Sequence, residues 1–441
     1  MTNMVSRLTQ FESANEIKPE LACQVVDDEN GLLGYLVIDR SLRFGACGGV
    51  RMRTDVTLEE VAQLARTMTL KFGFMNIDCT GGAKAGIVAP SSLSGPERER
   101  VFRAFGKRLS PFIAGGLYTP GADMGTTEKD IAILLQGAGV SVRSQDSQDR
   151  TGYYTAQTVY EAVRRAAISL GFDFSTCSVA IEGFGKVGSM IARCLAEDGV
   201  RVVGVSTLEG AIYNAKGLDI ERLSLLREKL GDWMIDGYTE AERISRNELL
   251  ALDVDILVPC AGPWTINSEN VDQIKAKMIV GGANIPATLE AEEALFHQGK
   301  LFVPDFISNC GGVLGSILRG MGFSEHDIAG IVRDDFGAKI SKLIELSNLE
   351  GITPREVAIR IAQANIQKME KKMKGSSGAV TRILASVKQK GARGICLRVA
   401  SRAFQRQIGT TALRALALEH LRDLLHADAD LYKGDRLTCI H

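Results

Sequence analysis

The sequence predicts an α/β protein of two domains, the second a doubly wound, Rossmann-like fold. Its 441 residues are more than one domain usually holds. Residues 151–320 alternate short apolar runs with helical patterns, which is typical of a parallel sheet covered by helices. The glycine motif GFGKVG at 183–188 stands between one such run and a helical pattern, the context that a dinucleotide-binding turn requires.

Composition excludes several classes of function. A formal net charge of −1 gives no general attraction to nucleic acid or to a membrane. The N-terminal residues have no apolar core like that of a signal peptide, and no later apolar run is long enough to cross a bilayer. Nine dispersed cysteines without a CxxC pair indicate reduced thiols and a cytoplasmic protein. With only five histidines, we expect no metal site.

Residues 1–150 mix strand and helix patterns and form the predicted first domain. The run LGYLVIDRSL reads as a strand, and GACGGVRMR as a glycine-rich turn leading into another strand. Thr57 and Glu60 form a predicted capping box at the start of a helix. Lys71 lies on the apolar stripe of that helix, where a buried ammonium would need a partner. The alternative is a frayed helix end with Lys71 in water.

Two further charged residues stand beside glycines in this domain. Lys84 follows a diglycine in TGGAKAGI, and Asp123 lies in TPGADMGTTEKD. Viewed alone, Lys84 reads as an exposed loop lysine and Asp123 as a helix cap, because most charged side chains are solvated. Together with Lys71, they form a candidate site for a small charged substrate.

The second domain is predicted over residues 151–320. Its strands are expected within CSVAIEGFGKVG, RVVGVSTLEG, VDILVPCAG, AKMIVGGAN and KLFVPDFISN. In the glycine motif, Gly183 would allow the tight turn, Gly185 the approach to a pyrophosphate and Gly188 the close packing of helix and strand. The second strand ends in Ser206 and Thr207, without an acidic residue for the ribose or an arginine close behind it. The cofactor is therefore NAD or NADP.

The rest of the chain is predicted to be mainly helical. Residues 321–372 would form helices that pack back across both domains. Residues 375–441 read as a basic, amphipathic extension used in subunit packing. Basic charge without interleaved aromatic residues is poor evidence for nucleic-acid binding.

These motifs, in this order, resemble the glutamate/leucine/phenylalanine/valine dehydrogenase family. The likeness runs from about residue 25 to 372 and rests on GGVRM, MTLK, GGAK, GADMGTTEKD, TGYYTAQTV, GFGKVG, GAIYN, VDILVPCA, GAN and NCGGV. It implies reversible oxidative deamination of an L-amino acid to a 2-oxo acid and ammonia, with NAD or NADP, in a homo-oligomer.

The resemblance also assigns roles to residues. Lys71 would bind the substrate α-carboxylate, Lys84 would be the central catalytic residue and Asp123 would relay protons. Gly49 and Ser316 would complete the substrate site. The cofactor would meet Gly183, Gly185, Lys186, Val187, Gly188, Thr207, Thr155, Ala261, Asn284 and Asn309, with the two asparagines near the nicotinamide. Residue chemistry supports the catalytic role of Lys84, because apolar packing and the charge of Lys71 would lower its pKa toward about 7–8.

The substrate is less constrained. Glutamate-specific members of the family carry a lysine where this chain has Cys47, so an apolar amino acid is the first expectation. Glutamate is the alternative, because the cofactor domain and Ser316 look more like the glutamate branch. A third reading is a non-catalytic member with an assembly or regulatory role, against which the intact Lys71, Lys84 and Asp123 argue.

Overall fold

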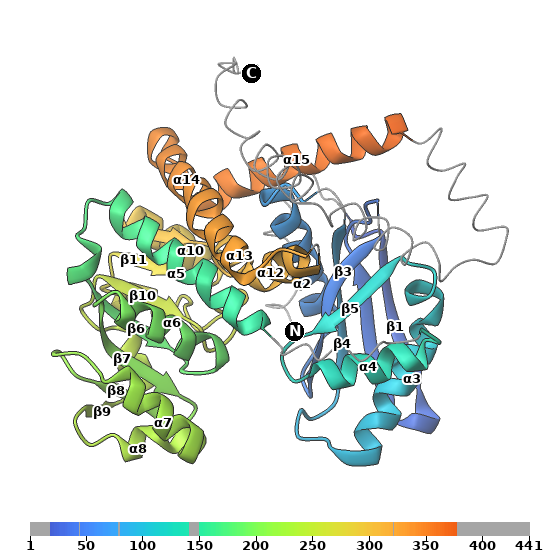
Figure 1. The fold of residues 1–441 in the computed structure, drawn as a ribbon, viewed down its shortest axis with the longest axis horizontal. Helices are drawn as coiled ribbons and strands as arrows, with labels where there is room; N and C mark the ends of the chain where they lie inside the picture. Colours follow the sequence, from blue (N-terminus) through green and yellow to red (C-terminus); the bar gives the residue numbers. More distant parts are fainter. Residues whose placement is uncertain (1–17, 44, 78–79, 141–149, 321, 377–441) are drawn as a thin grey trace. The chain divides into compact units, whose positions relative to one another are not determined.

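The computed structural model describes residues 18–376 except 44, 78–79, 141–149 and 321. These residues form two compact units (Figure 1). The first unit holds residues 18–73, 77–140 and 366–374, and the second holds 74–76 and 150–365. The predicted two-domain α/β class is confirmed, whereas the predicted domain bounds stay predictions. Most of the basic extension, residues 377–441, lies outside the described residues.

The first unit is built on a five-stranded sheet of order β1-β2-β4-β3-β5. β1 and β2 pair antiparallel, as do β2 and β4, while β3 pairs parallel with both β4 and β5. Its elements are β1 (Leu21–Asp27), β2 (Leu32–Ile38), β3 (Ala46–Arg53), α2 (Leu58–Phe74), β4 (Gly81–Val88), α3 (Gly95–Ile113), β5 (Tyr118–Ala122) and α4 (Glu128–Gly137).

The two faces of this sheet carry different side chains. Alternate residues of β3 and β4 enter one hydrophobic core with residues of α3 and α4, among them Val50, Ala85 and Phe105. The opposite face of the sheet lies against α2, because a Cβ added at Gly82 would come within 2.4 Å of the Thr69 hydroxyl oxygen. Since Lys84 is two residues from Gly82, it lies on the α2 face.

One expectation for the first unit was wrong in detail. The residues GACGG were predicted as a turn before a strand, but β3 already begins at Ala46. The glycines allow β3 and β4 to approach each other closely, because a Cβ at Gly48 would lie only 1.6 Å from the carbonyl oxygen of Ala83. Lys84 likewise belongs to an inner strand and not to an exposed loop.

The second unit has a seven-stranded sheet of order β12-β11-β10-β6-β7-β8-β9. The first five strands of that order run parallel, and β8 and β9 are added antiparallel at one edge. The strands are β6 (Ser178–Glu182), β7 (Arg201–Thr207), β8 (Gly210–Tyr213), β9 (Glu242–Ile244), β10 (Ile256–Pro259), β11 (Met278–Val280) and β12 (Leu301–Val303). The five predicted strands are thus confirmed as β6, β7, β10, β11 and β12.

Helices complete the second unit (Figure 1). They are α5 (Thr151–Ser169), α6 (Lys186–Glu197), α7 (Ile220–Leu230), α8 (Met234–Gly237), α9 (Arg246–Leu250), α10 (Leu289–His297), α11 (Asp305–Ser308), α12 (Gly311–Gly320), α13 (Glu325–Ile331), a π-helical turn η6 (Val332–Phe336), α14 (Gly337–Glu350) and the start of α15 (Pro354–Ser376). No helix in the described ranges is long and apolar enough to cross a membrane.

Candidate active site

A row of four charged side chains, three of them buried and Asp123 partly buried, marks the α2 face of the first unit. Lys84 extends from β4, and its Nζ lies 3.1 Å from Oδ2 of Asp123, which directly follows β5. Arg51 of β3 donates from Nε to the same oxygen at 2.9 Å and from Nη1 to Glu60 at 2.7 Å. We call Glu60, Arg51, Asp123 and Lys84 the charge row. Cations and carboxylates alternate along it, as burial of charge requires.

Lys71 completes this cluster from α2. Its side chain is buried, with an exposed fraction of 6%. The interpretation as a frayed helix end in water is therefore wrong, and the prediction of an inward-facing lysine is confirmed. The charge of Lys71 acts on Lys84, so the two ammonium groups belong to one electrostatic environment.

The surroundings set the proton affinity of the lysine and the aspartate. Burial lowers the pKa of Lys84 to about 8, with the charges of Arg51 and Lys71 adding to that effect and Asp123 opposing it. Burial alone would raise the pKa of Asp123, but Lys84 and Arg51 outweigh it and hold the pKa of this carboxyl well below its usual range. The amine can therefore lose its proton near neutral pH while the carboxylate stays ionised.

Gly49 is required where the structure places it. A Cβ there would lie 2.7 Å from Cβ of Asp123 and 3.1 Å from the carbonyl oxygen of Ala122. The side chain of Thr126 fixes the same turn, because its hydroxyl donates to the carbonyl of Val50 at 2.8 Å and accepts from the backbone N–H of Asp123 at 2.9 Å. The glycine thus leaves Asp123 room to reach Lys84.

Two members of the charge row were missed in the sequence. Glu60 was interpreted as half of a capping box; its N–H does donate to the Thr57 hydroxyl at 3.1 Å, but its carboxylate accepts from Arg51 and Arg53. Arg51 stood inside the GGVRM motif without a role. The available signal was the period of two along β3, which places Arg51 on the same face as Gly49.

The glycine motif of the second unit forms a close turn between β6 and α6. Gly183 has φ +90°, and its N–H donates to the Ser206 hydroxyl at 2.9 Å. A Cβ at Gly183 would lie 2.7 Å from Cα of Ala261, and one at Gly188 would lie 2.0 Å from the carbonyl oxygen of Gly183. Gly185 precedes α6 as its N-cap, and the space around it is open.

Lys186 and Val187 begin α6 behind that turn, so the helix N-terminus opens beside Gly185. Backbone N–H groups at such a terminus are suited to phosphate. A side chain at Gly185 would fill the open space beside this turn. Without one, the turn has room for the pyrophosphate of a dinucleotide. Thr207 ends β7 and donates from its hydroxyl to the carbonyl of Asp232 at 2.8 Å.

The other predicted cofactor residues cluster around α11 and α12. Asn309 caps α11 and donates to the carbonyl of Ala283 at 3.0 Å and to Oδ1 of Asn284 at 3.2 Å. In the described part of the chain, Oδ1 of Asn309 is buried without a hydrogen-bond donor. A buried acceptor of this kind costs free energy unless a ligand supplies the donor, and a carboxamide N–H₂ would do so.

Thr155 and Ser316 use their hydroxyls locally. Thr155 donates to the carbonyl of Thr151 at 2.8 Å and lies against Gly312, where a Cβ would come within 2.9 Å of its hydroxyl oxygen. Ser316 is exposed on α12 and donates to the carbonyl of Gly312 at 2.6 Å. The second unit therefore gathers Thr155 and Ser316 around one glycine of α12.

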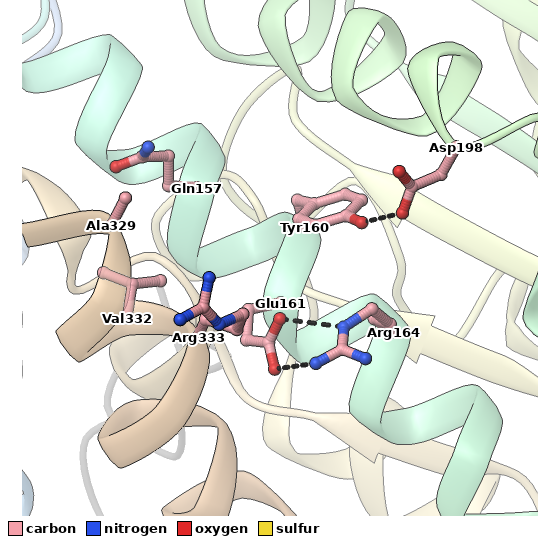
Figure 2. A pocket seen from close by; sticks show the side chains of 8 residues that line it. All are labelled: Gln157, Tyr160, Glu161, Arg164, Asp198, Ala329, Val332 and Arg333. Carbon is pink, nitrogen blue, oxygen red and sulfur yellow. Dashed lines mark hydrogen bonds and ion pairs between the residues drawn. The ribbon is translucent and has the colours of Figure 1, made fainter. Parts of the chain in front are cut away.

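A separate hollow of about 390 Å³ lies in the second unit (Figure 2). Figure 2 shows Arg164 paired with Glu161, and Tyr160 bonded to Asp198. These four polar groups thus pair with one another. The hollow is lined by Gln157, Tyr160, Glu161, Arg164, Asp198, Ala329, Val332 and Arg333. Among the residues that the structure describes, Oε1 of Gln157 is buried without a hydrogen-bond donor. Within the described residues, no cluster of three or more His, Cys, Asp or Glu side chains could hold a metal ion.

Comparisons with known proteins bear on both units. Residues 19–138 match the family model described as the Glu/Leu/Phe/Val dehydrogenase dimerisation domain, and residues 144–322 match that of Glutamate/Leucine/Phenylalanine/Valine dehydrogenase. A glutamate dehydrogenase of Thermotoga maritima is 38% identical over 298 residues, which are 64% of this chain and 70% of the relative. An NAD-specific glutamate dehydrogenase of Staphylococcus aureus is 34% identical over 333 residues, 70% of this chain and 79% of the relative.

A solved structure gives the same result. The hetero-hexameric glutamate dehydrogenase from Thermus thermophilus, in its leucine-bound form, superposes with a TM-score of 0.69 at 25% identity. The match covers 83% of this chain and 95% of that one. The similarity thus spans both units.

Proposed function

The chain belongs to the glutamate/leucine/phenylalanine/valine dehydrogenase family, and we propose that it catalyses the reversible oxidative deamination of an L-amino acid at the charge row. One observation carries this proposal: a lysine amine of pKa about 8 is buried against an ionised aspartate, with a second buried lysine close by. Such an amine can act as a base near neutral pH, which free lysine cannot.

Each residue has a proposed task. Lys71 binds the substrate α-carboxylate, which places the amino group and Cα near Lys84. Asp123 holds Lys84 in position, and because its own pKa is far below neutral it passes a proton only transiently. NAD or NADP, when bound, supplies the hydride acceptor. The glycine turn at 183–188 fits its pyrophosphate, and the orphaned acceptor of Asn309 fits the carboxamide.

The reaction starts from the substrate with its amino group neutral. Loss of a hydride from Cα leaves an iminium, which Lys71 keeps oriented through the carboxylate. Lys84, as the free amine, takes a proton from water as that water attacks the iminium carbon. The carbinolamine collapses to the 2-oxo acid, and the nitrogen leaves as ammonia after Lys84 returns the proton. Amino acid, oxidised cofactor and water thus give 2-oxo acid, ammonia, reduced cofactor and one proton.

An apolar L-amino acid is the first candidate substrate. Cys47 lies on β3 opposite Gly82 and Thr119 in the strand register, and brings no cation to the position where glutamate enzymes have lysine. Glutamate is the second candidate, because both curated relatives described above are glutamate dehydrogenases. The family model of the first unit names a dimerisation domain, which supports a homo-oligomer.

A substrate panel tests the proposal. The purified chain is assayed with leucine, valine, phenylalanine and glutamate, each with NAD and with NADP, by nicotinamide absorbance at alkaline pH. Turnover of an apolar amino acid supports the first candidate, and turnover of glutamate alone supports the second. Absence of turnover by a chain that still binds the dinucleotide would contradict the enzymatic proposal and favour a non-catalytic role.

A variant sharpens the substrate assignment. Cys47→Lys places a cation on the α2 face of β3, and we expect it to raise kcat/KM for glutamate at least tenfold relative to leucine. Cys47→Met is the matched control, because it lengthens the side chain without adding charge. If both variants changed the ratio of kcat/KM for glutamate and leucine equally, Cys47 would not determine which substrate is selected.

A further inference from the structure

Arg51 links two elements through one buried guanidinium. It is 1% exposed; its Nε donates to Asp123 after β5, and its Nη1 donates to Glu60 on α2. Arg51 and Lys84 contact the same oxygen of Asp123, at 2.9 and 3.1 Å. Two cations thus share one carboxylate oxygen, and none of the site roles discussed so far uses the second cation.

We propose that Arg51 is a positioning residue of the deamination reaction, acting through Asp123 to keep Lys84 a usable base. The inference rests on the proposed function, because it concerns the same lysine. Arg51 does not touch the reacting atoms in this role. It fixes where the aspartate points and how strongly that aspartate binds the lysine proton.

The charge of Arg51 changes how tightly Lys84 holds its proton. Facing only Asp123, a buried Lys84 would form a simple ion pair, which raises its pKa and keeps the amine protonated, and so unable to accept a proton, at neutral pH. Arg51 supplies an opposing positive charge at the same carboxylate. The charged groups that act on Lys84 come from three places: Asp123 after β5, Arg51 on β3 and Lys71 on α2. Burial and the two cations together bring the pKa of Lys84 to about 8.

The shape of the guanidinium also matters. Nε donates to Asp123 while Nη1 donates to Glu60, so one planar group fixes a carboxylate on each side. A lysine at position 51 would keep the charge but has a single nitrogen for both partners. Charge and geometry can therefore be separated by substitution.

The test is the pH dependence of kcat/KM for amino-acid oxidation in Arg51→Met and Arg51→Lys. Activity rises with pH as Lys84 loses its proton. Without the arginine charge, Lys84 holds its proton more tightly, so we expect the rising limb of Arg51→Met to move about one to two pH units upward. Arg51→Lys should keep the limb within about half a unit of the original while lowering kcat.

Glu60→Gln is the matched structural control. It removes the charge of the other partner of Arg51 but leaves the arginine charge beside Asp123, so the rising limb of its pH profile should not move to higher pH. If Arg51→Met does not fold because Glu60 is left buried, the double variant Arg51→Met/Glu60→Gln removes that carboxylate charge and takes its place. If Arg51 had only a structural role, every variant would have a lower melting temperature, and the rising limb of the pH profile would stay at the pH of the parent enzyme.

A second readout needs no substrate. The pH dependence of Lys84 acetylation by acetic anhydride is followed by mass spectrometry, with Lys129, which is 81% exposed, as the internal reference. Arg51→Met should shift the Lys84 profile upward and leave that of Lys129 unchanged. An unshifted Lys84 profile in the folded variant overturns the proposal. If the unmodified chain turns over no amino acid, the proposed function fails and with it the role of Arg51 in deamination, while acetylation still decides whether Arg51 lowers the proton affinity of Lys84.

Discussion

The candidate sites of the two units are built in opposite ways. In the first unit, five charged side chains meet on one face of a sheet, and four of them form the charge row. In the second, the main feature is the absence of side chains, because a Cβ at Gly183 or Gly188 would collide with backbone atoms. The first site adjusts the proton affinity of a base, whereas the second shapes room for a cofactor.

Two carboxyls, the partly buried Asp123 and the buried Glu182, show the contrast most directly. Asp123 lies between two cations, and its pKa is held well below the usual range. Glu182 ends β6, immediately before the glycine turn; burial raises its pKa to about 7, opposed only in part by a hydrogen bond from Thr265 and the charge of Arg246. Burial acts in the same direction on both groups, so neighbouring charge decides the difference.

The largest expected effect comes from removing the base of the first unit. Lys84→Ala should lower kcat by about three orders of magnitude or more, because the amine both activates water and returns the proton. Dinucleotide affinity should stay nearly unchanged, since the glycine turn belongs to the other unit. Steady-state kinetics and fluorescence titration with the reduced cofactor measure the two quantities. A loss in kcat below tenfold, about 1.4 kcal/mol, would remove Lys84 from the central role.

The converse change breaks the second site and spares the first. In Gly188→Ala, the new Cβ would lie 2.0 Å from the carbonyl oxygen of Gly183, a backbone atom that cannot move without shifting β6 from α6. We expect dinucleotide affinity to fall about tenfold to a hundredfold, while the acetylation profile of Lys84 stays unchanged. Gly330→Ala in α13 is the control, because the space around its Cβ is open. Equal losses in both variants would contradict the steric argument.

The sequence predicted the second unit better than the first. Five apolar runs, each followed by turn residues, identified all the parallel strands. Strands that are buried on both faces consist almost entirely of apolar residues, so they stand out in the sequence. The glycine motif located its turn for the same reason: a tight β–α connection demands glycine locally. The antiparallel strand β9 (Glu242–Ile244) was not foreseen, because its three residues carry no apolar run.

In the first unit, Lys71, Lys84 and Asp123 were found, but Arg51 and Glu60 were missed. Viewed alone, Lys84 looked like an exposed loop residue because most charged side chains are solvated, and Arg51 had no apparent partner. The bond between Arg51 and Asp123 joins positions 72 residues apart, and it depends on the parallel pairing of β3 with β5. Local patterns do not specify such a register, so the source of the lowered pKa was predicted only in part: burial and Lys71 were expected, Arg51 was not.

A smaller effect is expected from filling the space that Gly49 leaves beside Asp123. Gly49→Ala would bring a Cβ within 2.7 Å of Cβ of Asp123 and push the carboxylate away from Lys84. We expect kcat to fall about tenfold, with dinucleotide affinity unchanged. Gly121, the register partner of Gly49 on β5, has nothing within 4 Å of an added Cβ, so Gly121→Ala should lose less. A Gly49→Ala variant as active as the parent would show that Asp123 tolerates displacement.

The smallest expected effect concerns stability and sharpens the comparison of the two carboxyls. The folded pKa of Glu182 is raised to about 7, above its unfolded value, so the folded state holds the proton longer as pH rises. Stability is thus lost between about pH 4.5 and 7, and the cost is complete above pH 7. Glu182→Gln keeps an oxygen acceptor for Thr265 without the charge. It should raise the free energy of unfolding by about 1–3 kcal/mol at pH 8 and change it little at pH 4.5. Urea unfolding at both pH values measures this difference. An equal gain in the free energy of unfolding at both pH values would show that burial of charge is not what distinguishes Glu182 from Asp123.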